Sequence, residues 1–227
     1  DDKSMKVIQL IQSRKFVKHL LTFDNILPSI MAAKSYNIVS KELLFDPKIY
    51  DSETKTWKGE NSKNGSIKPS YLEAYDVYMG SLISVSLDRA GFISISIVHI
   101  SPIFAKEFLE LIIREANALI RNKDLEESSQ ALMYLKSELS KTSLVEIRES
   151  INTLIEAQLE IQMMANLNED YILVEMEPPF IPEKNIKTNR SLIVILSTIF
   201  GGILGMMIVL VRHYLLGKDS KLKQLFN

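Results

Sequence analysis

The feature that most constrains this chain is an uncharged run of twenty-one residues near its C-terminus, SLIVILSTIFGGILGMMIVLV, from Ser191 to Val211. Thirteen of its positions are Leu, Ile, Val or Phe, spread around every face of a helix. As a helix the run would span roughly 31 Å, the thickness of the hydrocarbon core of a bilayer. A helix buried in a globular domain usually keeps a polar stripe, and this run has none. The sequence therefore predicts a C-terminal transmembrane helix over residues 191–211.

Small residues form a ridge within this run. Ser197, Gly201 and Gly205 recur at every fourth position, and Gly202 lies beside them. Small side chains allow membrane helices to approach closely, so we expect these four residues to pack against another transmembrane helix. Three basic residues precede the run and four follow it, which slightly favours a cytoplasmic C-terminus.

Composition excludes several classes of protein. The net charge is −1 and no basic patch is concentrated anywhere, so no field would attract nucleic acid. The chain has no cysteine, which excludes disulfides, cysteine-ligated zinc and thiol catalysis. It begins at Asp1 rather than at methionine. We therefore expect a fragment or a processed form, whose missing N-terminal segment could hold a second membrane span.

Helical signals open the chain. Apolar residues recur at helical spacing from Ser4 to Phe23 and predict one amphipathic helix, which ends at Asn25–Pro28. A short helix to about Lys34 follows in this interpretation. Further along, Ser70 and Glu73 have the spacing of a capping box, so a helix should begin there.

Two neighbouring segments alternate apolar and polar residues. LISVSL covers residues 82–87 and FISISIVHI covers residues 92–100, with a turn between them. This alternation predicts a β-hairpin whose serine side chains face solvent. Residues 1–100 are therefore interpreted as the first part of an α+β base.

A long helical stretch follows the hairpin. Ser101 and Pro102 suit a helix start, and neither proline nor glycine occurs from Ile103 to Tyr171. The apolar stripe slips near residues 141–143 and restarts beyond them. The pattern favours two helices over about 102–141 and 144–168, folded back as a hairpin within residues 101–170. One continuous helix is the alternative.

The rest of the chain completes the expected architecture. YILVEME, residues 171–177, is a third strand candidate, and Pro178, Pro179 and Pro182 follow it. Each proline lacks an N–H group and fixes its own φ, so these residues predict a stiff extended connector. The predicted fold is α+β: a small mixed-sheet base with a long protruding helical hairpin and one C-terminal transmembrane helix. The last parts are the returning strand and Pro-containing connector (171–190), the transmembrane helix (191–211) and a cytoplasmic tail (212–227).

The apolar stripes of the long helices need a cover. A two-helix hairpin by itself buries little, so its remaining apolar residues indicate self-association. Alternatively, the stripes simply cover the α+β unit. The pattern leaves both possibilities open.

No catalytic constellation is recognisable. The chain has no GxxxxGK[ST] loop, and its three histidines, His19, His99 and His213, lie in unrelated segments. Nothing in the sequence assembles a nucleophile, a base and a group to orient it. We therefore expect a protein that is not an enzyme and that uses neither a cofactor nor a metal.

Four stretches together resemble the chain-length determinant (Wzz-type) family of bacterial polysaccharide co-polymerases. They are SRKFVKHLLTFDNILP (13–28), GFISISIVHISPIFAKEF (91–108), the segment from Tyr134 to Tyr171, and EPPFIPEK (177–184), which leads into the glycine-bearing run. The similarity lies in their order and spacing and covers nearly the whole chain.

The resemblance implies a fold and a function. Members of this family have two membrane helices that flank a periplasmic α+β domain with long protruding helices, and they form ring-like oligomers in the bacterial inner membrane. They act beside a polysaccharide polymerase, where they could also contact the lipid-linked glycan. The resemblance implies that this chain lacks the first membrane helix and regulates the length of a surface glycan such as O-antigen. It also maps the proline-rich segment of the family onto Pro178, Pro179 and Pro182, with no proline between Glu183 and the span.

Two other functions fit the sequence. One is a tail-anchored coiled-coil tether or adaptor without any link to glycans. The other is the transport component of a capsule system whose kinase is a separate chain, because only residues 212–227 follow the predicted span. The α+β base and the proline connector favour the regulator of glycan length, since a tether needs neither.

Overall fold

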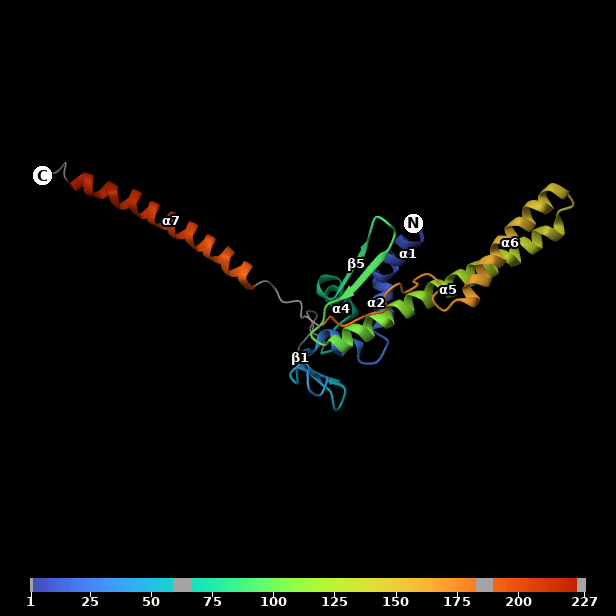
Figure 1. Ribbon diagram of the computed structural model, residues 1–227, viewed down its shortest axis with the longest axis horizontal. Coiled ribbons are helices and arrows are strands. Elements are labelled where there is room, and N and C mark those ends of the chain that lie inside the picture. The colour runs from blue at the N-terminus through green and yellow to red at the C-terminus, as the bar shows by residue number, and fades with distance from the viewer. Residues whose placement is uncertain (1, 59–66, 183–189, 224–227) are drawn as a thin grey trace. The chain divides into compact units, whose positions relative to one another are not determined.

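The computed structural model describes residues 2–58, 67–182 and 190–223, and the chain divides into two compact units, 1–181 and 182–227 (Figure 1). In chain order, the elements of the first unit are α1 (Asp2–Ile11), α2 (Arg14–Leu20), α3 (Ile26–Met31), β1 (Ala33–Asn37), β2 (Glu42–Phe45), β3 (Tyr50–Asp51), β4 (Thr56–Trp57), α4 (Tyr71–Val77), a π-helical turn η1 (Tyr78–Leu82), β5 (Ile83–Leu87), β6 (Ile93–Ile97), α5 (Pro102–Lys141) and α6 (Val145–Leu167). The second unit contains α7 (Arg190–Lys223).

The predicted pair of long helices is confirmed, and α5 and α6 fold back on each other as an antiparallel hairpin (Figure 1). The start of α5 is set by Ser101, whose Oγ accepts a hydrogen bond from the Phe104 amide at 3.2 Å, and by Pro102 in the first turn. Thr142 has an extended backbone that ends α5. The alternative of one continuous helix is therefore wrong.

The predicted β-hairpin is also confirmed. β5 and β6 pair antiparallel, with Val85 opposite Ile95 and Ser84 opposite Ser96. One face of the hairpin is therefore aliphatic and packs on the core, while the serine side chains face solvent. In the turn, Asp88 Oδ1 accepts hydrogen bonds from two main-chain amides, and Gly91 has a φ of 90°, which its lack of a Cβ permits.

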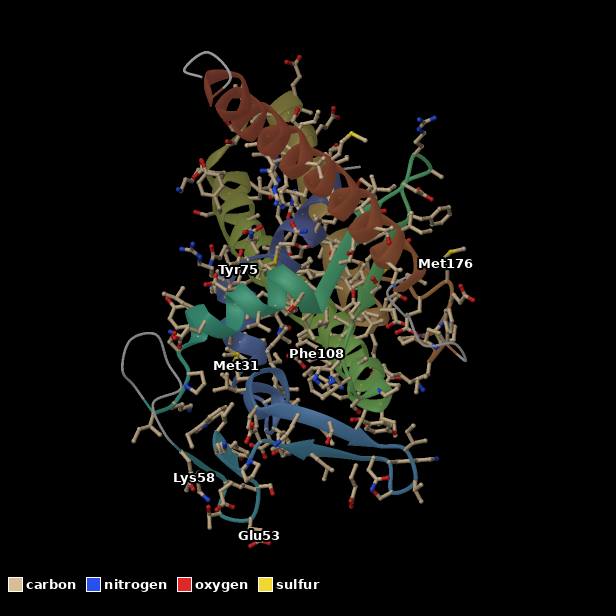
Figure 2. The ribbon with its side chains drawn as sticks, turned by 90° about the vertical axis from the view of Figure 1, so that its left-hand side faces the viewer. Met31, Glu53, Lys58, Tyr75, Phe108 and Met176 are labelled. Atoms are coloured by element: carbon tan, nitrogen blue, oxygen red, sulfur yellow. The ribbon has the colours of Figure 1, made fainter. Side chains whose placement is uncertain are left out.

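The core of the first unit lies where α1, α2, α4 and η1 meet the first turns of α5. Tyr78 and Phe108 form its centre, with ring centroids 6.2 Å apart in an edge-to-face arrangement. Figure 2 labels Phe108 of α5 and Tyr75 of α4, which packs against the same core. The buried members of the cluster are Val7, Ile11, Phe16, Val17, Leu20, Ile26, Tyr78, Leu82, Phe108, Leu111, Ile112 and Ala116. The base is therefore organised around the N-terminal part of the long helix.

Local capping signals decide two helix boundaries. The capping box is confirmed at α4, where Ser70 Oγ accepts from the Glu73 amide and Glu73 Oε2 accepts from the Ser70 amide. The single helix predicted over residues 4–23 is wrong, because Ser13 caps a new helix by accepting from the Phe16 amide at 3.1 Å. This cap separates α1 from α2.

The expected mixed-sheet base is not found in the described residues. They contain three separate two-stranded antiparallel sheets, β1–β2, β3–β4 and β5–β6. The first two were not predicted, because their strands are short and lack a sustained alternation of apolar and polar residues. The α+β class holds, but the strands are not gathered into one sheet.

The strand predicted at residues 171–177 is also wrong. No regular strand forms there, although the segment follows α6 back along α5 (Figure 1). A side chain of α5, rather than a neighbouring strand, satisfies part of its main chain, as described below.

The apolar run lies in α7, as predicted. The helix does not end at residue 211 but continues through residues 212–223 of the predicted tail. Residues 183–189 of the predicted connector and 224–227 of the predicted tail lie outside the described residues.

Candidate functional site

The main chain that returns from the helical hairpin is fixed by one side chain, Asn117 of α5. The amides of Ile172 and Leu173 donate to Asn117 Oδ1 at 3.0 and 2.8 Å, and Asn117 Nδ2 donates to the Leu173 carbonyl at 2.9 Å. Asn117 is 2 % exposed. A carboxamide thus replaces the partner strand that this segment lacks, and it satisfies main-chain groups that would be costly to bury unpaired.

A second contact fixes the direction of the return. The Tyr171 hydroxyl donates to Asp124 Oδ2 at 2.8 Å. Partial burial, with this hydrogen bond, raises the pKa of Tyr171 to about 12. As the chain proceeds from Tyr171 to Leu173, its partners move from Asp124 back to Asn117. The segment therefore runs antiparallel to α5, toward the N-terminal end of that helix, and Ile172 and Leu173 pack against the core there.

From residue 174 to residue 182 the chain is largely exposed. Pro178, Pro179 and Pro182 lie in this segment, which has no helix or strand up to residue 182. Proline cannot donate a main-chain hydrogen bond, so this conformation suits the sequence. The structure places all three predicted connector residues in the same exposed stretch, and Figure 2 shows Met176 projecting outward from it.

The helical hairpin is held by a few specific contacts. At its tip, an Arg148 guanidinium nitrogen donates to the carbonyls of Leu139 and Thr142, both at 3.2 Å, and so closes the turn between the helices. Nearer the base, Gln162 Nε2 donates to Ser129 Oγ at 2.8 Å. The residues buried between the helices are Ser128, Leu132, Ile151 and Ala165.

Many other apolar side chains of the hairpin are exposed. Of the two helices, the N-terminal half of α5, from Phe104 to Ile120, covers the base. The apolar stripes beyond this part of α5 do not cover the α+β unit. Of the two possibilities left open by the sequence, cover of the α+β unit therefore applies only to the N-terminal half of α5. The exposed apolar residues of the hairpin are Met133, Tyr134, Leu144, Val145, Ile147, Leu154, Leu159, Ile161, Met163, Met164 and Leu167. These residues, called the hairpin surface below, are left exposed by the described residues of the first unit.

The helix α7 is long and apolar enough over Val194–Arg212 to span a membrane. The side chains described in it are exposed to the surroundings. Ser197, Gly201 and Gly205 follow one face of the helix, and Gly202 adjoins it. A Cβ added at Gly201, Gly202 or Gly205 would meet no atom within 4 Å. Within α7 itself, the predicted ridge thus leaves room for a close neighbour.

The titratable side chains inside the first unit make structural contacts. His99 Nδ1 accepts from the Ser101 amide at 3.1 Å, so the proton of the neutral ring lies on Nε2, which donates to the Ser29 carbonyl at 3.0 Å. Burial lowers the pKa of His99. His19 Nε2 lies 2.8 Å from Glu115 Oε2 and so joins α2 to α5.

Two further observations concern chemistry within the described residues. Tyr78 is buried with its hydroxyl donating to the Ile11 carbonyl at 3.2 Å, and burial raises its pKa. No cluster of three or more His, Asp or Glu side chains with the geometry to hold a metal ion occurs in the part of the chain that the structure describes. The contacts of His19, Tyr78 and His99 therefore join separate elements of the fold.

Asn117 is a site residue that the sequence analysis missed. The signal was a polar residue directly after Ala116 on the apolar stripe of α5 that includes Phe108 and Ile112. A carboxamide on the inward face of a helix must find partners, because its desolvation is otherwise uncompensated. The position could have indicated a polar contact, but not its partner, which lies more than fifty residues away in sequence.

Comparison with known proteins gave no match, either among protein-family models or among curated proteins.

Proposed function

We propose that this protein is an oligomeric regulator of surface polysaccharide chain length in the bacterial inner membrane, a co-polymerase that acts beside a polysaccharide polymerase. The observation that supports it best is the combination of three features in one chain. A helical hairpin leaves a large apolar surface uncovered, its return is fixed to the base by Asn117, and an exposed proline segment then leads toward a helix of membrane-spanning length.

In this proposal the first unit lies in the periplasm, α7 crosses the inner membrane and the C-terminus is cytoplasmic. The hairpin surface and the ridge of α7 are the contacts between copies of the chain. The oligomer is a scaffold and not an enzyme: it forms no bond itself and requires no cofactor. It holds the polymerase, together with the lipid-linked glycan, in an arrangement that favours one product length.

The hairpin surface carries the assembly step of this proposal. Leu154 keeps 53 % of its surface exposed in a single copy. A charge there should be tolerated by the monomer, since substitutions at exposed positions usually change stability by less than about 0.5 kcal/mol. The same charge buried between copies would cost several kcal/mol, on the order of 3, unless it found a partner.

The test is a gel of surface polysaccharide from three strains: a deletion, a deletion complemented with the full chain, and one complemented with Leu154→Asp. We expect the deletion to lose the preferred length band while short chains remain, and Leu154→Asp to resemble the deletion. Asn152→Asp is the matched control, because it adds the same charge at an exposed position of α6 and should preserve the band. An unchanged ladder in the deletion strain would refute the proposal.

The same gel separates the alternatives. A tail-anchored coiled-coil tether or adaptor would use the helical hairpin and α7 and leave the ladder unchanged. A transport component of a capsule system, working with a separate kinase, would instead lose polymer altogether at the surface. Only a length regulator loses the band and keeps the polymer.

A further inference from the structure

The β1–β2 hairpin presents two aliphatic side chains to solvent at its tip. Val39 is 94 % exposed and Ile38 is 80 % exposed, more than any other large apolar side chain in the described residues. Neither residue belongs to the core or to the hairpin surface. Scattered exposed aliphatic residues are ordinary, but two consecutive ones at the tip of a hairpin form a projecting apolar point.

The turn that carries these residues is held in shape. Asn37 Oδ1 accepts hydrogen bonds from the amides of Val39 and Ser40 at 2.9 and 3.2 Å. Lys41 completes the turn with a φ of 58°, and Glu42 returns opposite Asn37 in the strand register. The turn therefore holds Ile38 and Val39 in an outward position. Little conformational entropy would be lost if these two side chains bound to another surface.

This tip lies at the end of the first unit from which the chain leaves. The Asp46 amide donates to the Ala32 carbonyl and so holds the hairpin beside α3. In α3, the Ser29 carbonyl accepts from His99, three residues before the first residue of α5. The segment returning from α6 runs toward the same N-terminal end of α5. Figure 1 shows β1 near this end, far from the tip of the α5–α6 hairpin.

The side chains of this hairpin have the chemistry of a membrane interface. Tyr36 and Leu43 are half-buried opposite each other in the strands below the tip. Lys41 is exposed in the turn, and Lys34 is exposed near the start of β1. Tyrosine is enriched at the level of the lipid headgroups, and lysine is attracted to anionic headgroups. Residues 33–45 contain two lysines and one acidic residue, Glu42. The formal charge of the β1–β2 hairpin is therefore positive.

We propose that the tip of the β1–β2 hairpin, Ile38 and Val39, inserts into the headgroup and acyl boundary of a bilayer that contains anionic lipid. This inference rests on the part of the proposed function that places α7 in the membrane. The tip then gives the first unit a second, shallow contact with the same bilayer, in addition to its covalent connection to α7. Such a contact would set the orientation of the base above the lipid.

The absence of cysteine makes a site-specific test direct. Three single variants of the full chain, Val39→Cys, Glu53→Cys and Leu204→Cys, are labelled with the fluorophore NBD. Each is reconstituted into nanodiscs of phosphatidylethanolamine and phosphatidylglycerol, with and without lipids that carry a doxyl quencher on the acyl chain. Glu53 is the matched control, since it lies in the turn of the neighbouring β3–β4 hairpin (Figure 2).

We expect the probe at position 39 to shift to shorter emission wavelength and to lose most of its emission to quenchers near the headgroups. The probe at position 53 should show neither change. The probe at position 204 should be quenched most strongly by doxyl groups deep in the acyl chain.

The probe at position 204 separates the two proposals. Quenching at 204 without quenching at 39 overturns the insertion of the hairpin and leaves the membrane helix standing. A blue shift at 39 without quenching means that protein covers the tip, such as a second copy, and also overturns it. No quenching at 204 would instead refute the membrane placement of α7.

Discussion

Asn117 and Leu173 are joined at both polar groups of the main chain: the Leu173 amide donates to Asn117 Oδ1 at 2.8 Å, and Asn117 Nδ2 donates to the Leu173 carbonyl at 2.9 Å. This pair connects the long helix α5 to the segment that leads out of the first unit. The buried carboxamide of Asn117 therefore links this segment to α5.

Asn117→Ala should loosen this return segment. It leaves the main-chain groups of residues 172 and 173 without their partner, which costs about 1–3 kcal/mol of unfolding free energy because a buried polar group then stays unsatisfied. Urea unfolding of the full chain in detergent measures the loss. Hydrogen exchange at the amides of Ile172 and Leu173 should also become faster.

Asn166→Ala is the control for this experiment. Asn166 is exposed and donates to the Gln162 carbonyl of its own helix, so its removal should change stability by less than about 0.5 kcal/mol. Equal effects of the two alanine variants, with unchanged exchange at residues 172 and 173, would show that Asn117 does not hold the segment.

Acidification should destabilise the first unit through His99. Burial lowers the pKa of His99 in the folded state, so the unfolded state binds a proton first. The contribution of neutral His99 to the free energy of unfolding is complete above the ordinary histidine pKa of about 6.5. This contribution is lost as the pH falls from there through the lowered pKa of the folded state. Urea midpoints at pH 7.5 and 5.5 measure this loss. His99→Gln keeps a donor for the Ser29 carbonyl but cannot titrate, so it should show a smaller loss; an identical loss in both proteins would assign the pH dependence to other groups.

Leu204→Arg tests membrane insertion of α7. A charge at the middle of Val194–Arg212 should raise the cost of insertion by about 2.5–3.5 kcal/mol. The wild type should stay in the pellet after alkaline carbonate extraction, and the variant should appear partly in the supernatant. Release of the intact wild type would contradict a transmembrane α7.

Gly205→Leu tests the small-residue ridge. A Cβ added at Gly205 lies in open space within α7, so the variant should fold and insert normally. If the ridge contacts another helix, leucine would hold the two backbones apart and lower crosslinking between cysteines placed in α7. Leu210→Ile, also exposed in α7, should leave crosslinking unchanged. Normal crosslinking in both variants would remove the ridge as a packing surface.

Several elements could be predicted from the sequence because their causes are local. The start of α5 follows from Ser101 and Pro102, and the start of α4 from the reciprocal hydrogen bonds of Ser70 and Glu73. The alternation of apolar and polar residues fixed the faces of β5 and β6. In each case the partners are close in sequence, so the pattern contains both of them.

The errors have several causes, of which one is a contact between residues far apart in sequence. Residues 171–177 have the composition of a strand, but their main chain pairs with the carboxamide of Asn117 instead of with another strand. The break between α1 and α2 depends on the cap of Ser13, which interrupts an apolar periodicity that continues across it. β1 and β2 were missed because they are short and their pairing depends on a turn held by Asn37.

For the candidate site the same division applies. The sequence by itself determined the apolar run of α7, the ridge at Ser197, Gly201 and Gly205, and the proline segment, because hydropathy, side-chain size and a missing N–H group are properties of single residues. Only the tertiary structure decided which apolar residues of the helical hairpin are covered, that Asn117 holds the returning chain, and that Ile38 and Val39 project from the base. Burial and hydrogen-bond partnership are relations between residues far apart in sequence, and the folded chain alone brings such residues together.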